Sequence, residues 1–193
     1  MDTDGPLPRR RTGIPVYALT SGCAWRYLPP TFGTPPATAH RRFATWTRAG
    51  LWRRLHRTVL DELGTKGALD WTSAIIDAAA SVKPLLLGVP AIRSRRGPRR
   101  RLPVKIRADK AYYSAEYLAW LRSRGFIARI ARPGNESGER LGRHRWKIER
   151  SIARLYGYRR LTVRYERKGS HFLAFLGLAA ALTCYKELAK LTT

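Results

Sequence analysis

Two aspartates stand in sequence surroundings that suit the binding of a ligand or a cation. Asp77 follows the apolar run 74–76, and Asp109 follows the alternating segment 104–108. The first run contains β-branched residues and the second alternates with a period of two, so both segments are predicted to be short strands. If these strands are adjacent and parallel, both carboxylates lie at the sheet edge where α/β folds usually place ligand chemistry. Asp77 has an ordinary alternative role, because a strand-end Asp often caps the next turn.

Glu149 is the third acid of interest. It lies at the border of the apolar face of a helix predicted over 142–155. A helix crossing the strand edge would bring Glu149 within a few ångströms of Asp77 and Asp109, and three carboxylates that close repel each other unless cations neutralise them. The alternative is an ion pair between Glu149 and Arg145, one turn earlier.

Hard oxygen ligands of this kind suit Mg²⁺ or Mn²⁺. Two such ions about 4 Å apart activate a water or a 3′-hydroxyl and stabilise the leaving oxygen in phosphodiester chemistry. We therefore predict that Asp77, Asp109 and Glu149 are both the catalytic residues and the ligands of two divalent ions.

The charge balance points to a polyanionic partner. The 193 residues carry 38 Lys and Arg against 13 Asp and Glu, a formal net charge of +25. Nucleic acid is the first expectation and an anionic membrane surface the second; a general bias toward Arg is the alternative. Candidate DNA-binding residues are Arg41, Arg42, Arg48, Arg95, Arg96, Arg99, Arg100, Arg101, Arg143, Arg145, Lys147, Arg150 and Arg154.

Several other kinds of site are not indicated. The two cysteines, Cys23 and Cys184, lie far apart, and the four histidines lack metal-binding spacing. There is no Gly-rich phosphate loop and no local signature of a catalytic triad. No signal peptide is visible, and the apolar run 172–185 is shorter than the ~20 residues of a membrane span. We expect a cytoplasmic protein that does not enter membranes.

The chain divides into three predicted parts. Residues 1–13 are expected to be a disordered basic tail, 14–66 a helical DNA-contacting domain, and 67–193 an α/β catalytic domain with a basic loop at 83–103. The Trp residues of the helical part are equally explained as core residues.

Local patterns predict further elements in this order. Thr38 is expected to cap a helix over 39–49, and Gly50 to separate it from a helix over 51–63. Segment 74–76 is expected to be a central strand. A loop is expected over 132–141. The remaining predictions are a helix from Ser114 to Arg124, strands over 126–130 and 161–165, and an apolar C-terminal helix over 171–191.

The order of several motifs carries a family resemblance. Ser-Gly-Cys-Ala-Trp-Arg-Tyr-Leu-Pro-Pro occupies 21–30, and Arg-Phe, Trp, Gly-Leu-Trp and Leu recur over 42–55. Leu-Asp-Trp precedes Ile-Ile-Asp77, Ala-Asp109-Lys-Ala-Tyr follows, and His-Arg-Trp-Lys-Ile-Glu149-Arg comes last. Over nearly the whole chain this order resembles bacterial insertion-sequence transposases of the DDE class, insertion-sequence-five group.

The resemblance implies a ribonuclease-H-like catalytic domain behind a small helical N-terminal domain. It implies metal-dependent cleavage and strand transfer at element ends, with Asp77, Asp109 and Glu149 as the successive acids, and Arg145 and Trp146 matching the residues before the Glu. Its implied partners are double-stranded DNA of the terminal repeats and of the target, and further copies of the chain assembled on nucleoid DNA.

Two departures from the family pattern leave other readings open. The segment between Asp77 and Asp109 is shorter than the pattern, as if two strands were missing, which would leave strand edges unpaired. Lys110 and Ala111 follow Asp109, where the family favours Gly before Tyr112. The alternatives are a non-catalytic DNA-binding remnant of a transposase and, from a different class, a basic RNA-binding structural protein.

Overall fold

The chain forms two compact units. The computed structural model describes residues 9–76, 82–108, 110–130, 139–163 and 165–192. One unit, here called unit 1, combines 1–59 with 153–193, and unit 2 comprises 60–152. Helices α3 (Leu51–Thr65) and α6 (Glu139–Tyr156) each begin in one unit and end in the other.

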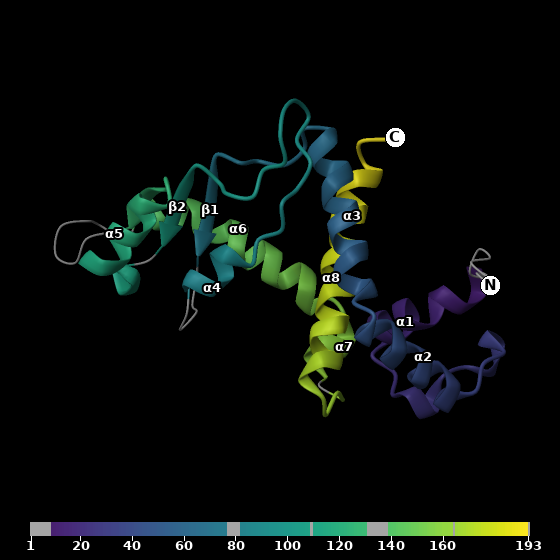
Figure 1. The fold of residues 1–193 in the computed structure, drawn as a ribbon. Helices are drawn as coiled ribbons and strands as arrows, with labels where there is room; N and C mark the ends of the chain where they lie inside the picture. Colours follow the sequence, from purple (N-terminus) through teal and green to yellow (C-terminus); the bar gives the residue numbers. More distant parts are fainter. Residues whose placement is uncertain (1–8, 77–81, 109, 131–138, 164, 193) are drawn as a thin grey trace. The chain divides into compact units, whose positions relative to one another are not determined.

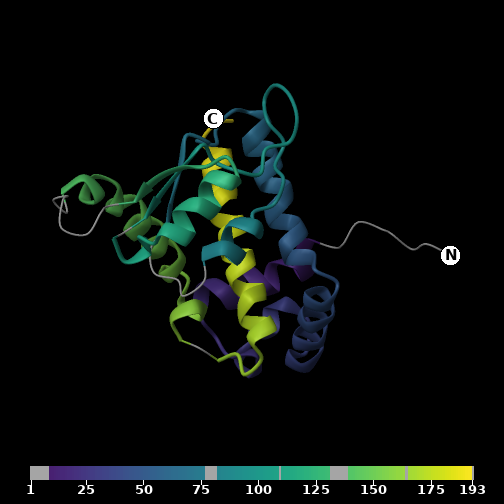
Figure 2. The same cartoon turned by 60° about the vertical axis from the view of Figure 1, so that its left-hand side comes forward.

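Unit 1 is helical in its described part. Besides parts of α3 and α6, it contains α1 (Arg9–Ser21), the 3₁₀ turns η1 (Trp25–Tyr27) and η2 (Pro30–Phe32), α2 (Pro36–Arg48), α7 (Arg159–Thr162) and α8 (Gly169–Ala189). The two ends of the chain therefore build one core. In both views α8, drawn in yellow, runs beside the blue α3 (Figures 1 and 2).

Aromatic rings fill the core of unit 1. Phe43 of α2 stacks on Phe175 of α8 with ring centroids 4.4 Å apart, and Trp52 of α3 lies 5.4 Å from Phe43. Phe43 and Phe175 are fully buried, and each such ring removes a large apolar area from water. Trp46 packs against the same cluster, so Trp46 and Trp52 are core residues.

Helix α8 is long and apolar enough, by length and composition, to cross a membrane. Part of its surface is nevertheless used inside unit 1, where Phe175, Leu178 and Ala179 join the core cluster. A core helix that is apolar almost all round has the same composition as a membrane span. The prediction of a packed C-terminal helix is confirmed, with bounds of Gly169–Ala189.

Unit 2 contains a small parallel sheet. Its strands are β1 (Ser73–Ile76), β2 (Lys105–Ala108) and β3 (Ile127–Ile130), in the order β1-β2-β3. α4 (Val82–Leu87) lies in the chain between β1 and β2, while η3 (Lys110–Tyr112) and α5 (Ala115–Ser123) lie between β2 and β3. In the described sheet β1 is therefore an edge strand, and the prediction of a central strand at 74–76 is wrong.

Helix α5 packs on this sheet and provides much of the core of unit 2. Tyr117 and Leu121 of α5 join Ile106 of β2 and Ile130 of β3 in one buried cluster. Ser114 caps α5, because its hydroxyl accepts a hydrogen bond from the backbone N–H of Tyr117 at 3.1 Å. The predicted cap, helix and following strand are confirmed here.

Two predictions at the N-terminal side are wrong. Residues 9–13, expected to be disordered, form the first turns of α1, while 1–8 lie outside the described residues. The helix expected to be capped by Thr38 begins at Pro36 instead. Proline suits the first helical position, because its fixed φ angle is helical and its missing N–H would have no partner there.

The strand predicted over 161–165 is also wrong, since α7 covers Arg159–Thr162. Leu161 is buried in the core of unit 1, so a tertiary contact outweighs the local pattern. Helix α6 begins at Glu139, so the end of the loop predicted over 132–141 is helical, while 132–138 lie outside the described residues. The loop expected over 83–103 is helical up to Leu87, and one antiparallel bridge joins Ile92 to Arg100.

Candidate functional site

The strands that precede the two predicted aspartates are neighbours. β1 and β2 run parallel, and their last residues, Ile76 and Ala108, are register partners. Asp77 and Asp109 themselves lie outside the described residues. Adjacent strands are about 4.8 Å apart, so the described strands end side by side, at Ile76 and Ala108, at the same edge of the sheet.

Glu149 lies on α6, within unit 2, and its side chain is exposed. Hydrogen bonds from the Thr72 hydroxyl and N–H lower the pKa of Asp70, and the charge of Lys147, two residues before Glu149, lowers it slightly further. Asp70 precedes β1, so Lys147 lies near the amino end of that strand. Ile76 and Ala108 stand at the opposite, carboxyl end.

No group of three His, Cys, Asp or Glu side chains close enough to hold a metal ion occurs among the residues whose placement is described. The predicted triad includes Asp77 and Asp109, which fall outside that search. The assignment of Asp77, Asp109 and Glu149 as catalytic metal ligands therefore stays a prediction.

The basic side chains of α6 differ in their surroundings. Lys147 and Arg150 are exposed, and the guanidinium of Arg150 lies 6.0 Å from the ring centroid of Trp146. Arg154 is half-buried and forms an ion pair of 2.8 Å with Glu187 of α8, which gives it a role within unit 1. The side chains of Arg143 and Arg145, with the predicted Arg145–Glu149 pair, lie outside the described residues.

The Arg-rich segment 93–101 is held to α3 by one carboxylate. Asp61 Oδ1 accepts hydrogen bonds from the backbone N–H of Arg93 at 2.7 Å and from Arg99 Nη1 at 2.8 Å. Arg99 Nη1 also donates to the carbonyl of Ala91 at 2.9 Å. Arg99 thus anchors the segment to α3.

The remaining arginines of this segment face solvent. Arg95, Arg96, Arg100 and Arg101 are exposed. The first three line a cavity of about 380 Å³ together with Gly64, Gly67, Leu69, Trp71 and Ser94. A cavity lined by three exposed arginines is a surface suited to phosphate oxygens.

The predicted contacts on α2 are also accessible in part. Arg41 and Arg48 are exposed, and Arg42 is half-buried. Arg48 Nη2 lies 3.5 Å from Thr45 Oγ1, a weak interaction that leaves most of its hydrogen-bonding capacity to other partners.

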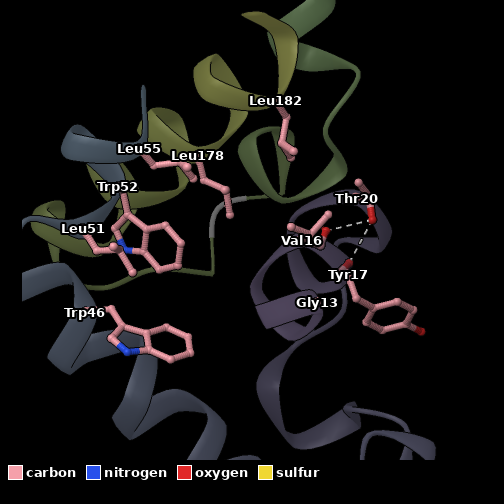
Figure 3. A pocket seen from close by; sticks show the side chains of 10 residues that line it. All are labelled: Gly13, Val16, Tyr17, Thr20, Trp46, Leu51, Trp52, Leu55, Leu178 and Leu182. Carbon is pink, nitrogen blue, oxygen red and sulfur yellow. Dashed lines mark hydrogen bonds between the residues drawn. The ribbon is translucent and has the colours of Figure 1, made fainter. Parts of the chain in front are cut away.

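An apolar cavity of unit 1 offers a different chemistry. It measures about 660 Å³ and lies among α1, α2, α3 and α8, as Figure 3 shows. Its described lining consists of Gly13, Val16, Tyr17, Thr20, Trp46, Leu51, Trp52, Leu55, Leu178 and Leu182. Thr20 directs its hydroxyl to the carbonyls of Val16 and Tyr17, so this lining presents no charged group to a metal or a phosphate.

A buried charged cluster in unit 1 was not predicted from the sequence. Arg160 is 1% exposed, and its Nε donates to Glu166 Oε1 at 2.9 Å while its Nη1 donates to the carbonyl of Cys23. Glu166 Oε2 lies 3.8 Å from Nδ1 of His171, whose pKa is lowered mainly by burial. The only available signal was a single Glu inside the basic run 159–168.

Comparisons with known proteins agree along both parts of the chain. Residues 10–56 match the model of a family described as "putative transposase of IS4/5 family", and residues 79–184 match the "transposase DDE domain" family. No solved structure matches the chain.

Two curated relatives come from Burkholderia cepacia. The "putative transposase for insertion sequence element IS402" is 37% identical over 133 residues, which are 69% of this chain and 63% of the relative. The "insertion element IS402 uncharacterized 16.2 kDa protein" is 36% identical over 70 residues, 36% of this chain and 47% of the relative. The chain thus spans about half to two thirds of the length of these relatives. The DDE match covers more than half of the chain and contains β2, β3 and the helices from α4 to α7, so this protein belongs to the family of insertion-sequence DDE transposases.

Proposed function

We propose that this chain is a DNA transposase that cleaves insertion-sequence ends and joins them to target DNA, using Asp77, Asp109 and Glu149 to hold two Mg²⁺ or Mn²⁺ ions. The observation that carries the proposal is the parallel register of β1 and β2, in which Ile76 and Ala108 are partners. The residue after each is an aspartate.

The donor set fits hard divalent cations. Carboxylate oxygens are the ligands that Mg²⁺ and Mn²⁺ prefer, and two carboxylates at neighbouring strand ends repel each other without a cation. When bound, such ions supply activation of a water or a 3′-hydroxyl and stabilisation of the leaving oxygen. The chain contributes the rigid strands that position two acids and the helix that carries the third.

The finer features follow from the same proposal. The sheet order β1-β2-β3 is compatible with a ribonuclease-H-like catalytic domain over 67–193, with 14–66 as a helical DNA-contacting domain. Double-stranded DNA of terminal repeats and target sites is the proposed substrate, bound by the exposed arginines through its phosphates. Self-association on DNA and a cytoplasmic, nucleoid-associated location belong to this reading.

A second function is favoured by one observation. Between β1 and β2 the described chain holds only the short α4 and the single bridge Ile92–Arg100. This arrangement is also that of a DNA-binding transposase remnant without catalysis.

A nicking assay separates the two functions. Supercoiled plasmid carrying the DNA that flanks the gene is incubated with the full chain and Mg²⁺, Mn²⁺ or EDTA. Catalysis predicts metal-dependent nicking that Asp77→Asn, Asp109→Asn or Glu149→Gln abolishes, with DNA affinity retained. Glu116→Gln is the matched control, because Glu116 is an exposed acid paired with Lys83 at 2.6 Å on unit 2.

Each other outcome has a definite meaning. If the Asp77→Asn or Asp109→Asn variant still nicks DNA, the proposed site is wrong. If only the Glu149→Gln variant still nicks DNA, Glu149 is not part of the site. DNA binding without nicking in the parent leaves the remnant as the function. Preference for structured RNA over duplex DNA in competition supports the RNA-binding alternative.

A further inference from the structure

We propose that unit 1 carries a second DNA contact, a cationic cavity beside Trp25 that binds a backbone phosphate. This inference rests on the proposed function in DNA binding and assigns the contact to Arg26, Arg167 and Lys168, which are not among the DNA-binding residues predicted from the sequence. The cavity measures about 590 Å³, and its described lining includes Trp25, Arg26, His40, Arg167, Lys168 and His171.

The charge at the opening of this cavity is positive. Arg26, Arg167 and Lys168 are exposed. Glu166 is the only acid in the described lining, and it is buried against Arg160, which neutralises it. An anion approaching the cavity therefore meets three cations and no exposed carboxylate of the lining, which favours a phosphate oxygen.

The start of α8 adds to this preference. Lys168 is the residue before α8, and no side chain caps the first turn of this 21-residue helix. The first N–H groups of a helix lack intrahelical partners and carry a partial positive charge, so a helix start of this kind favours an anion. Lys168 and His171, both at this turn, line the cavity.

Trp25 forms part of the wall of the cavity. Its indole Nε1 is buried and has no hydrogen-bond acceptor among the described residues. A buried donor without an acceptor costs about 1–3 kcal/mol, so such groups are rare. The ring of Trp25 packs on the guanidinium of Arg160, which lies 5.0 Å from the ring centroid and also lines the cavity.

Duplex DNA fits these observations better than a small phosphate compound. The cations that line the cavity are exposed to solvent, and an extended polyanion can contact them together. Arg41, an exposed residue already predicted to contact DNA, follows His40 of the cavity on α2. Inorganic phosphate and a mononucleotide share the same chemistry, so the experiment must include both.

The main test measures the salt dependence of DNA affinity. A fluorescent 30-base-pair duplex is titrated with the full chain, with Arg167→Ala/Lys168→Ala, and with Arg53→Ala/Arg57→Ala between 50 and 200 mM salt. Arg53 and Arg57 are exposed on α3 and do not line the cavity, so this control loses the same charge in the same unit. We expect the cavity variant to bind the duplex at least tenfold more weakly at 100 mM salt. The slope of its log affinity against log salt should be smaller by about 1–2. The affinity of the control variant should change less than threefold.

Equal losses in the two variants, or no loss in the cavity variant, would overturn the inference while leaving DNA binding itself in place. A parent chain that does not bind DNA overturns both this inference and the proposed function. Melting temperatures of the variants within 2–3 °C of the parent, roughly 1 kcal/mol at this chain length, show that the fold is retained.

An NMR titration identifies the source of the phosphate. The imidazole signals of His40 and His171 are followed as duplex DNA, inorganic phosphate or deoxyadenosine monophosphate is added at equal phosphate concentration. Shifts with duplex at concentrations where the small compounds have no effect support the inference. Shifts with the small compounds alone, or with none of the three, contradict it.

Discussion

Arg160 and Glu166 form an ion pair in the interior of unit 1, with 2.9 Å between Nε and Oε1. The guanidinium also lies 5.0 Å from the ring centroid of Trp25 and 4.8 Å from that of Phe175. Breaking such a pair is costly, because the remaining charge stays buried without its partner. This relationship connects η1, α7 and α8 and underlies the first prediction.

Glu166→Ala should lower the free energy of unfolding by about 3–5 kcal/mol, measured by urea denaturation. Lys190→Ala is the control, because Lys190 pairs with Glu187 at the surface at 3.2 Å and such pairs contribute about 0–1 kcal/mol. A loss below 1 kcal/mol for Glu166→Ala would show that the pair does not hold the core together.

Gly64→Ala should destabilise unit 2, although alanine favours helices. A Cβ at Gly64 would lie 1.9 Å from the carbonyl oxygen of Arg93, so segment 93–101 must leave α3 or shift. We expect a loss of about 1–3 kcal/mol and faster trypsin cleavage within that segment. Gly13→Ala meets nothing within 4 Å in α1 and should stabilise by about 0.5–1 kcal/mol. Equal effects of the two substitutions would exclude the clash.

Arg99 and Arg101 should respond differently to substitution, although both were predicted to contact DNA. Arg99→Ala removes the anchor to Asp61 and should increase trypsin cleavage of segment 93–101. Arg101 is exposed, so Arg101→Ala should leave cleavage of the segment unchanged. It should weaken DNA binding and reduce the salt dependence of the affinity by the amount that one phosphate contact contributes. Unchanged trypsin sensitivity in Arg99→Ala would contradict the anchoring role.

The melting temperature should fall on acidification from pH 7.5 to 5.5. Burial lowers the pKa of His56 and of His171, so below about pH 6.5 the unfolded chain takes up protons that the folded chain does not. Stability is therefore complete above that pH and declines as the pH falls toward the folded-state pKa values. The double variant His56→Gln/His171→Gln should show a smaller fall in melting temperature over this pH range, measured by differential scanning fluorimetry. A fall as large as that of the parent chain would show that other groups cause it.

Mg²⁺ should raise the melting temperature of the parent chain if the three acids hold it. An ion present at 100 times its dissociation constant adds about 2.7 kcal/mol. Asp77→Asn should remove this effect and Glu116→Gln should keep it, because Glu116 lies outside the proposed site and pairs with Lys83. A shift that survives Asp77→Asn would place the bound ion elsewhere.

Local patterns determined much of unit 2 in advance. The alternation in 104–108 and the β-branched run 74–76 were sufficient for two strands, and Ser114 was identified as the cap of α5. These features depend on neighbouring residues, so a linear reading reveals them. The family could also be recognised from the sequence alone, because motif order survives even where the segment between Asp77 and Asp109 is short.

The tertiary structure decided which of the many basic residues are used inside the molecule. Arg99 meets Asp61, 38 positions away in the chain, and Arg160 is buried between Cys23 and Glu166, while Arg101 and Lys168 remain exposed. In sequence these residues look alike, since each lies in a run of positive charge. Burial and pairing depend on contacts between distant segments, which no local period encodes, and the same contacts turned the expected strand at 161–165 into α7.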